Sequence, residues 1–253
     1  MTIKIFNSLI KKTKSYRKLE DRVSMLENFI CSQEHHCLIQ LKNDGCMYLP
    51  YMFTDAIQKH LFTERNFYEI EILIDLDQYF QDINVIFDVG ANIGNHSVYW
   101  ALKHNLKAIH AFEPLTDTYN ILRKNIDHNH ISHVVSCHNI GIGKTPSKAS
   151  VDKTNRTNIG ATSLKADQNG NITINSIDSF LGENSDVDFI KIDVEGFELD
   201  VLMGSMQTLR RCKPIIFIET FEDNKEEVCA ILGSAGYRLE KEYENDNFLF
   251  IHR

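Results

Sequence analysis

Short apolar runs alternate with amphipathic segments from residue 84 onward. The runs are continuous, which is typical of parallel strands that are buried on both faces. They are Val85–Val89, Lys107–Phe112, His133–His138, Phe189–Val194 and Ile215–Ile218. Helical spacing marks the segments between them, among them Asn95–Lys103, Thr116–Asn125 and Glu198–Arg210. The alternation predicts βαβ units and a parallel sheet covered by helices on both faces.

Other patterns flank these units. Two pairs of short runs surround turn residues and predict antiparallel hairpins: Cys37–Leu41 with Met47–Tyr51 around Asn43-Asp44-Gly45, and Tyr237–Tyr243 with Phe248–His252. Residues 55–81 have helical spacing and predict one or two helices. We therefore expect a hairpin and helical cap over residues 34–83. An α/β domain, with a mostly parallel sheet that ends in an antiparallel hairpin, is expected over residues 84–253.

Residues 1–33 differ from the rest. Up to Lys18 the chain has basic side chains and no acidic one. Apolar residues then recur in steps of three and four, the period of a coiled-coil seam: Tyr16, Leu19, Val23, Leu26 and Ile30. The predicted helix has three interpretations, namely packing on its own domain, a homo-oligomer contact, or binding to an anionic membrane surface. Glu20, Asp21 and Glu27 disfavour the membrane surface.

Composition is that of an ordinary globular protein, with 43% hydrophobic and 25% charged residues in 253. The net charge of −8 disfavours a nucleic-acid binder, which needs a basic surface. No apolar run reaches the ~18 residues that span a bilayer, and early lysines interrupt any signal peptide. We expect no stable membrane insertion and a soluble, cytoplasmic protein. The six cysteines form no C-x-x-C pair, so we expect reduced thiols, mostly in the core.

A glycine turn follows the first strand of the α/β domain. It reads Asp88-Val89-Gly90-Ala91-Asn92-Ile93-Gly94, and such a turn lets a ligand lie close to backbone amides and a helix N-terminus. Asn92 replaces the second glycine of the dinucleotide fingerprint, the one that admits a pyrophosphate. Asp88 would place a carboxylate at the mouth of the site. That charge favours the cationic S-adenosylmethionine (SAM) over NAD.

The second and third strands add candidate cofactor contacts. Glu113 lies nineteen residues beyond Gly94, where an acid can accept hydrogen bonds from ribose hydroxyls, and Pro114 stops the strand. Asn139, after the third strand, either donates to an adenine nitrogen or is a turn asparagine. Taken alone, Asp88 would be a helix-capping acid and Glu113 a solvated loop acid. Together with the glycine turn, in the spacing found here, the two acids predict a ligand site.

A second acidic cluster follows the strand at Phe189–Val194. Ligands bind at the carboxyl ends of strands in open α/β sheets, so Asp193, Glu195 and Glu219 are expected near a reacting centre. One of the first two would orient and deprotonate an acceptor hydroxyl, with Glu219 in support. They could instead cap the helix near Gly196. A divalent metal held by the three carboxylates is a further alternative, disfavoured because no histidine pattern supports it.

Five stretches together resemble the FkbM-type methyltransferase family: VIFDVGANIGNHS, AFEP, GATSL, IDSFL and DFIKIDVEGFELDVLMG, in that order over residues 84–220. The resemblance implies a SAM-dependent class I O-methyltransferase with a Rossmann-like, seven-stranded sheet. Such proteins often act on sugar hydroxyls in polysaccharide or natural-product pathways. Carried over by position, Asp88, Gly90, Asn92 and Gly94 form the SAM loop and Glu113 holds the ribose. Thr162 and Ser163 would lie on a loop over the active site, with Asp193 and Glu195 facing the acceptor.

The resemblance departs after Glu219. Family members often have a histidine two positions beyond that glutamate, whereas this chain continues with Thr220 and Phe221. Acceptor recognition is expected in residues 34–83. The acceptor is expected to be a small molecule or glycan with a hydroxyl. Two competing interpretations are a non-catalytic assembly partner that keeps the fold, and a nicotinamide-dependent enzyme, which Asn92 disfavours.

Overall fold

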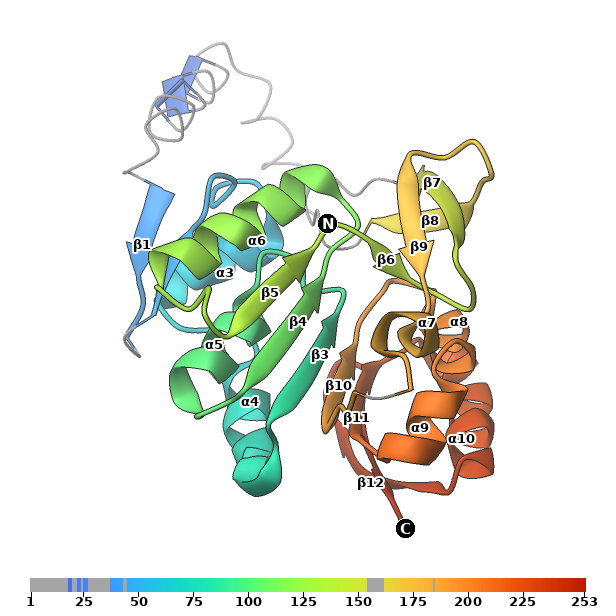
Figure 1. Cartoon of the computed structure of the whole chain (residues 1–253). Helices are drawn as coiled ribbons and strands as arrows, with labels where there is room; N and C mark the ends of the chain where they lie inside the picture. The colour runs from blue at the N-terminus through green and yellow to red at the C-terminus, as the bar shows by residue number, and fades with distance from the viewer. Residues whose placement is uncertain are drawn as a thin grey trace, which may run out of the picture.

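A seven-stranded sheet forms the centre of the computed structural model, which describes residues 18–19, 22–23, 25–26, 37–42, 45–153, 162–183 and 185–253 (Figure 1). Its strand order is β12-β13-β11-β10-β3-β4-β5. The strands are β3 (Val85–Val89), β4 (Ala108–Phe112), β5 (Val135–His138), β10 (Phe189–Ile192), β11 (Ile215–Glu219), β12 (Tyr237–Tyr243) and β13 (Asn247–His252). Strands β11, β10, β3, β4 and β5 are parallel, and β13 pairs antiparallel with both β11 and β12. The predicted parallel sheet with a terminal hairpin is confirmed.

Both faces of this sheet are buried, which explains the continuous apolar runs. In β3, Ile86 belongs to one hydrophobic cluster, whereas Phe87 and Val89 belong to the other. Figure 1 shows the helices on either side of the sheet. One group is α3 (Ala56–Glu64), α4 (Ile70–Leu76), α5 (Asn95–Lys103) and α6 (Thr116–His128). The other is α7 (Ile177–Leu181), α8 (Glu198–Met203), α9 (Met206–Cys212) and α10 (Lys225–Ser234), with a 3-10 turn η3 (Glu222–Asn224) before α10.

The helix predicted over 198–210 is instead two helices, α8 and α9. They are separated at Gly204, where the chain approaches a neighbouring loop. A Cβ atom at Gly204 would lie 2.1 Å from the carbonyl oxygen of Gly143. This close backbone contact requires glycine at the break between the two helices, because a side chain would not fit there.

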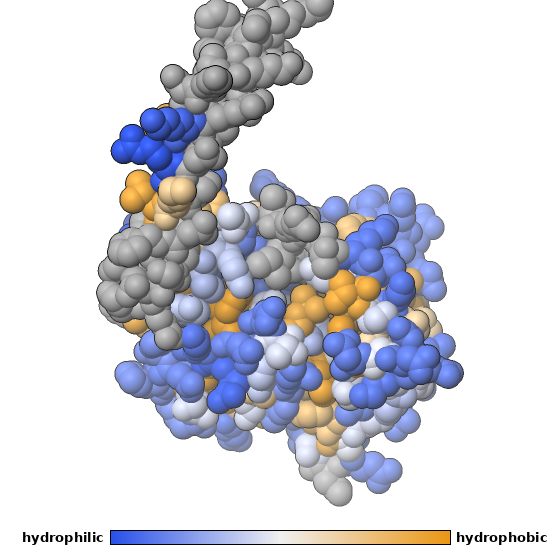
Figure 2. All heavy atoms as spheres, turned by 90° about the horizontal axis from the view of Figure 1, so that it is seen from above, coloured by the Kyte–Doolittle hydropathy of each residue, from blue (hydrophilic) through white to orange (hydrophobic). Residues whose placement is uncertain are grey.

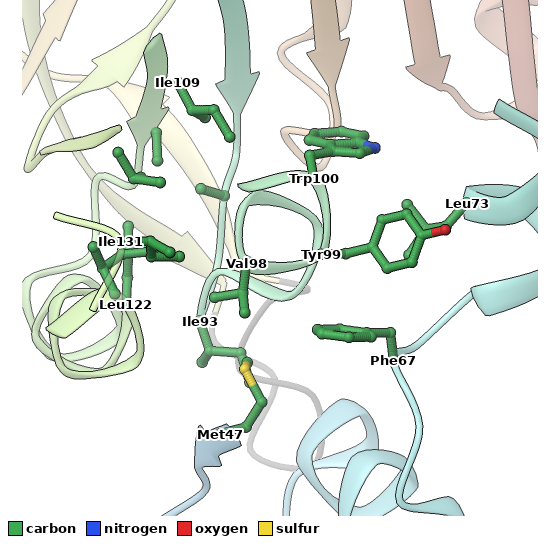
Figure 3. Close-up of a cluster of buried hydrophobic side chains, with 14 of the residues drawn as sticks. Met47, Phe67, Leu73, Ile93, Val98, Tyr99, Trp100, Ile109, Leu122 and Ile131 are labelled. Carbon is green, nitrogen blue, oxygen red and sulfur yellow. The ribbon is translucent and has the colours of Figure 1, made fainter. Parts of the chain in front are cut away.

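The cap over residues 38–82 packs into the same core as α5 and α6. It consists of β1 (Leu38–Gln40), β2 (Cys46–Tyr48), α3, α4 and the 3-10 helix η2 (Asp77–Asp82), so the predicted hairpin and helices are present. Figure 3 shows Met47 and Phe67 of the cap beside Ile93, Tyr99 and other side chains around α5. Polar contacts add to this packing. The backbone amide of Cys46 donates to Asn129 (2.9 Å), and that side chain donates back to the carbonyl of Cys46 (2.6 Å).

A second, four-stranded sheet was not predicted. It has the order β6-β9-β7-β8, with β6 (Gly141–Ile142), β7 (Ser147–Lys153), β8 (Ser163–Ala166) and β9 (Ile172–Asn175). Only Ala149, Ile172 and Ile174 form its buried cluster. The sheet lies between β5 and α7 in sequence and beside the carboxyl end of the main sheet, at the upper right of Figure 1.

Most of the N-terminal segment lies outside the described residues, including Tyr16 and Ile30 of the predicted seam. Residues 18–19, 22–23 and 25–26 are helical. Leu19, Val23 and Leu26 are 58%, 43% and 62% exposed. These three side chains are exposed, and both the packing of the helix on its own domain and the homo-oligomer contact stay predictions.

Seen from above, hydrophobic residues gather toward the middle of the molecule and hydrophilic residues toward its rim (Figure 2). Within the described ranges, no helix combines the length and the apolar character needed to cross a bilayer. The five described cysteines are free thiols, but only Cys37 is buried. The other four are half-buried, and three of them, Cys137, Cys212 and Cys229, pack against the hydrophobic core as expected.

Candidate functional site

The glycine turn between β3 and α5 forms one end of a cleft. Gly90 and Gly94 have positive φ angles of 79° and 90°, and Asn92 is left-handed at 50°. The backbone amides of Gly90 and Ala91 both donate to the carbonyl of Phe112 (3.0 and 2.9 Å), which ties the turn to the end of β4. A Cβ atom at Gly90 would lie 1.7 Å from the carbonyl oxygen of Asp193. Only glycine fits there, so the turn touches the end of β10 directly.

Glu113 lies at the end of β4 and is almost fully buried in this cleft. Its carboxylate accepts hydrogen bonds from the backbone amides of Asn92 (3.0 Å) and Leu115 (2.8 Å). Burial raises the pKa of Glu113 to about 7, although these two amides oppose the shift. The carboxylate is held in one position, where it can also accept from a hydroxyl pair.

Asp88 is buried beneath the cleft, and its side chain does not line it. The expectation of a carboxylate at the mouth of the site is therefore wrong. Asp88 accepts a hydrogen bond from the Ser97 hydroxyl (2.6 Å) and lies 3.5 Å from the Lys191 ammonium. It holds the start of α5 and a buried lysine, instead of contacting the cleft itself.

Lys191 was not singled out from the sequence, because a lysine in an apolar strand gives no local signal of a site. Its ammonium donates to the carbonyl of Gly90 (2.9 Å) and to the Asp193 carboxylate (3.0 Å). Burial opposes its charge, but Asp193 and Asp88 outweigh that effect and raise the pKa of Lys191. Lys191 therefore stays charged and fixes one oxygen of Asp193.

The predicted carboxylates Asp193, Glu195 and Glu219 do come together and line the same cleft as the glycine turn. Glu195 is left-handed (φ 52°), a rare conformation for a residue with a side chain. Burial, followed by repulsion from Asp193 and Glu198, raises the pKa of Glu195 to about 7. Burial, followed by repulsion from Asp193 and Glu69, raises the pKa of Glu219 to about 8. Carboxyl groups with such pKa values can exchange protons near neutral pH.

The cap contributes a wall that sequence reasoning did not identify at residue level. Tyr68, Glu69 and His96 line the cleft beside the carboxylates. Asn95 bonds to both the amide (2.9 Å) and the carbonyl (3.1 Å) of Tyr68, so the cap segment is fastened to the start of α5. His96 Nε2 lies 3.4 Å from the Glu69 carboxylate. Tyr68 and Glu69 are far from the motifs in sequence, so no spacing could have found them, whereas His96 lies within the first quoted motif, on α5, and was not singled out.

The remaining predicted residues divide into two groups. Ala91, Pro114 and Thr162 line the cleft, whereas Gly94, Asn139 and Ser163 do not. Asn139 donates to the carbonyls of Glu113 (2.9 Å) and Pro114 (3.1 Å). Both of its amide protons are therefore used, which favours the structural turn role that the sequence left open. The whole cleft encloses about 1120 Å³, part of it open to solvent.

Comparison with known proteins agrees with this geometry. The profile described as "Methyltransferase FkbM domain" matches residues 88–239, more than half of the chain. The chain belongs to the FkbM methyltransferase family. The predicted resemblance is thus confirmed, and the seven-stranded sheet is the Rossmann-like core of an FkbM methyltransferase domain.

Three similar proteins are named. "Methyltransferase 1" of Beauveria bassiana is 28% identical over 49% of this chain and 59% of its own length. "Hexuronic acid methyltransferase AglP" of Haloferax volcanii is 30% identical over 54% of this chain and 56% of its own length. The match therefore spans less than two thirds of either relative. A crystal structure of methyltransferase FkbM from Methylobacillus flagellatus is 22% identical, with a TM-score of 0.46 over 68% of this chain and 44% of that one.

The cleft of the FkbM domain suits SAM. The buried Glu113 carboxylate offers acceptors for ribose hydroxyls, and the acidic far end suits a sulfonium. Phosphate groups would meet several carboxylates and, in the described part of the lining, one lysine or arginine, the Lys191 side chain. Across the described ranges, no three His, Cys, Asp or Glu side chains are grouped so that they could hold a metal ion.

Proposed function

We propose that this FkbM domain transfers a methyl group from SAM to a hydroxyl of a small molecule or glycan. One observation carries the proposal. A single cleft has a cofactor-type end, with the glycine turn and Glu113, and an acidic end with Asp193, Glu195 and Glu219. Family membership supports the reaction class, and the chemistry of the acidic end supports oxygen as the acceptor atom.

The cofactor end would hold SAM through Glu113, the backbone around Gly90–Asn92 and Pro114. When bound, SAM supplies an electrophilic methyl carbon on a sulfonium that leaves as a neutral thioether. The chain must then align the hydroxyl oxygen with that carbon and accept its proton, since the new O–C bond forms as the C–S bond breaks. The carboxylates at the acidic end suit both tasks.

Glu195 and Glu219 are the candidate proton acceptors. In the ligand-free protein their pKa values of about 7 and about 8 leave them partly protonated near neutral pH. A positive charge in the cleft favours their ionised forms, because opposite charges attract strongly in a partly dry site. The arrival of a cationic donor would thus generate the base beside the hydroxyl. Asp193, oriented by Lys191, would accept the hydroxyl hydrogen bond.

Acceptor recognition is assigned to the cap, because Tyr68 and Glu69 form a cleft wall beside the carboxylates. The name of the Haloferax volcanii relative includes a hexuronic acid, which supports a sugar as the acceptor class. A homo-oligomer contact through Leu19, Val23 and Leu26 is a separate proposal that their exposure supports.

The decisive experiment separates SAM binding from turnover. Calorimetry with SAM and with NAD tests the cofactor, and transfer from radiolabelled SAM to a panel of sugars tests the reaction. Asp193→Asn and Glu195→Gln should each bind SAM normally yet lose about 100-fold or more in turnover. Turnover that survives both substitutions would refute the assignment of the acidic end. SAM binding without transfer to any hydroxyl would favour the non-catalytic assembly partner.

A further inference from the structure

A second, smaller cavity of about 290 Å³ adjoins the cleft. It shares Asp193, Glu195 and Glu219 with the cleft, so these three carboxylates form the wall between the two spaces. Its remaining wall comes from elements that do not reach the cofactor end: Glu198 at the start of α8, Thr220 and Phe221 after β11, and Asp246 in the β12–β13 turn. Five carboxylates therefore surround a space on the acceptor side.

Two buried polar groups of this cavity lack a partner. Glu198 and Thr220 are each 2% exposed, and both line the cavity. One Glu198 oxygen accepts from the backbone amide of Gly196 (2.8 Å), but Glu198 Oε2 has no hydrogen-bond partner, and neither has Thr220 Oγ1. A buried oxygen without a donor is costly, so folded proteins rarely keep one without a ligand or function. The free Glu198 oxygen indicates a ligand that brings a donor, and the Thr220 hydroxyl can accept a second hydrogen bond from the same ligand.

The charge of that ligand follows from what surrounds the space. In the described lining of both cavities, Lys191 is the one lysine or arginine, and Gly90, Asp193 and Asp88 already occupy its ammonium, while His96 lies beside Glu69. Burial raises the pKa of Glu198, and repulsion among neighbouring carboxylates adds to the same effect at Glu195 and Glu219. Negative charge is thus uncompensated there, and a cation with several N–H donors would relieve it.

Between two kinds of cation, the geometry favours an ammonium. A metal ion needs three or more ligands that converge on one point, and the described residues contain no such group. An ammonium has three separate donors, each of which can reach a different oxygen. The spread of Glu198, Thr220 and the shared carboxylates around the cavity suits the second pattern.

We propose that the second cavity binds a protonated primary amine of the methyl acceptor, so that the acceptor is an amino-bearing sugar or a similar hydroxylated amine. This inference rests on the proposed function and names its substrate class. It also separates the chain from the relative named for a hexuronic acid. A uronate is an anion, which five carboxylates would repel, whereas an ammonium in the cavity would hold a neighbouring hydroxyl beside Asp193, Glu195 and Glu219.

Binding of matched sugars to the full chain tests the inference. The probes are the methyl glycosides of glucosamine, N-acetylglucosamine, glucose and glucuronic acid, measured by calorimetry at pH 7 with S-adenosylhomocysteine present. The amine should bind about tenfold or more tightly than its N-acetyl form, and the glucuronide should bind least, because only the amine brings a charge-assisted donor set. Equal affinities, or no binding of the amine, would overturn the proposal.

Single substitutions test whether the preference for the amine arises in the second cavity. Glu198→Gln keeps the size of the side chain but removes its charge, and Thr220→Val removes the unpaired hydroxyl. Each should reduce the preference for the amine to about twofold while S-adenosylhomocysteine binding stays unchanged. Glu226→Gln, an exposed acid on α10, removes the same charge elsewhere and should keep the preference. A preference unaltered in Glu198→Gln would refute the site.

Three outcomes separate this proposal from its alternatives. Saturable binding of Mg²⁺ or Mn²⁺ that Glu198→Gln abolishes would replace the amine with a metal ion. If S-adenosylhomocysteine fails to bind the unaltered chain, the proposed function fails. If it binds and the sugars show no amine preference, the proposed function stands and the acceptor class alone is wrong.

Discussion

The two ends of the cleft are built in opposite ways. At the cofactor end, Glu113 is held by two backbone amides and the glycine turn is bonded to the end of β4. At the acidic end, the carboxylates lie close together, and Glu198 and Thr220 keep unpaired oxygens. One end is organised before any ligand arrives, whereas the other needs a positive charge to become stable. Hence breaking the contacts at the cofactor end should lower the stability of the protein, and removing a negative charge at the acidic end should raise it.

The largest effect is expected at Lys191, which joins the two ends. Lys191→Met leaves the fully buried Asp88 without its counter-ion and should lower the free energy of unfolding by about 3–5 kcal/mol. Chemical denaturation measures the change. Lys165→Met is the matched control. Lys165 lies 3.7 Å from Asp152 on the surface, and its loss should cost about 0–1 kcal/mol. Similar losses in the two variants would contradict the buried role of Lys191.

Gly90→Ala should have the next largest effect. Its Cβ atom would overlap the carbonyl oxygen of Asp193 and would force a positive φ on alanine, at a cost of about 2–4 kcal/mol. Gly196→Ala at the acidic end is the control. Its φ is 107°, but no atom lies within 4 Å of the added Cβ, so only the strain of about 1–2 kcal/mol applies. Thermal unfolding measures the Tm of each variant against that of the unaltered chain. Equal shifts in Tm for the two variants would rule out the backbone contact.

Glu113→Gln tests the role of the Glu113 carboxylate in stability and in SAM binding. One amide oxygen can accept from only one of the two backbone donors with the same geometry, and the NH₂ group would face the other. The loss should be about 1–3 kcal/mol in the free energy of unfolding, together with weaker SAM binding by calorimetry. Asp117→Asn, an exposed acid at the start of α6, should leave both quantities unchanged. Unchanged SAM affinity in Glu113→Gln would exclude a ribose contact.

The smallest effect concerns pH and the acidic end. The pKa of Glu219 is raised from 4.5 to about 8 in the folded protein, so folding takes up a proton between these values. Its contribution to stability is present below about pH 4.5 and is lost as the pH rises through about 8. The ligand-free protein should therefore lose about 1–2 kcal/mol from this group between pH 5 and pH 8, after allowance for its partial exposure.

Glu219→Gln provides the measurement. Because glutamine does not titrate, the variant should lose less stability than the unaltered chain over the same pH range, and should be as stable or more stable at pH 8. The free energy of unfolding of both proteins is measured by urea denaturation across this pH range. If it changes equally with pH in the two proteins, Glu219 is not buried among like charges. The same variant also tests the proton acceptor, since the pH dependence of kcat/KM should change with it.

Sequence reasoning reached the main sheet because buried parallel strands are continuous apolar runs, as at Val85–Val89. It missed the four-stranded sheet because strands such as Ser147–Lys153 are mostly exposed and polar, so their pattern does not differ from that of a loop. It brought Asp193, Glu195 and Glu219 together correctly, since all follow strands at one sheet edge. Asp88 was misplaced because strand position does not reveal on which side of the turn a carboxylate lies. Lys191 was missed because two of its partners, Asp88 and Gly90, lie about a hundred residues away in sequence, so its own strand gives no local signal.

The contact between Gly90 and the Asp193 carbonyl has a consequence for how such a site can diversify. Donor and acceptor must be aligned closely for transfer, and here the spacing between the two ends is set by main chain against main chain. Side chains around the cleft can therefore be exchanged for others, and with them the kind of molecule that is accepted, while the separation of the reacting atoms is preserved.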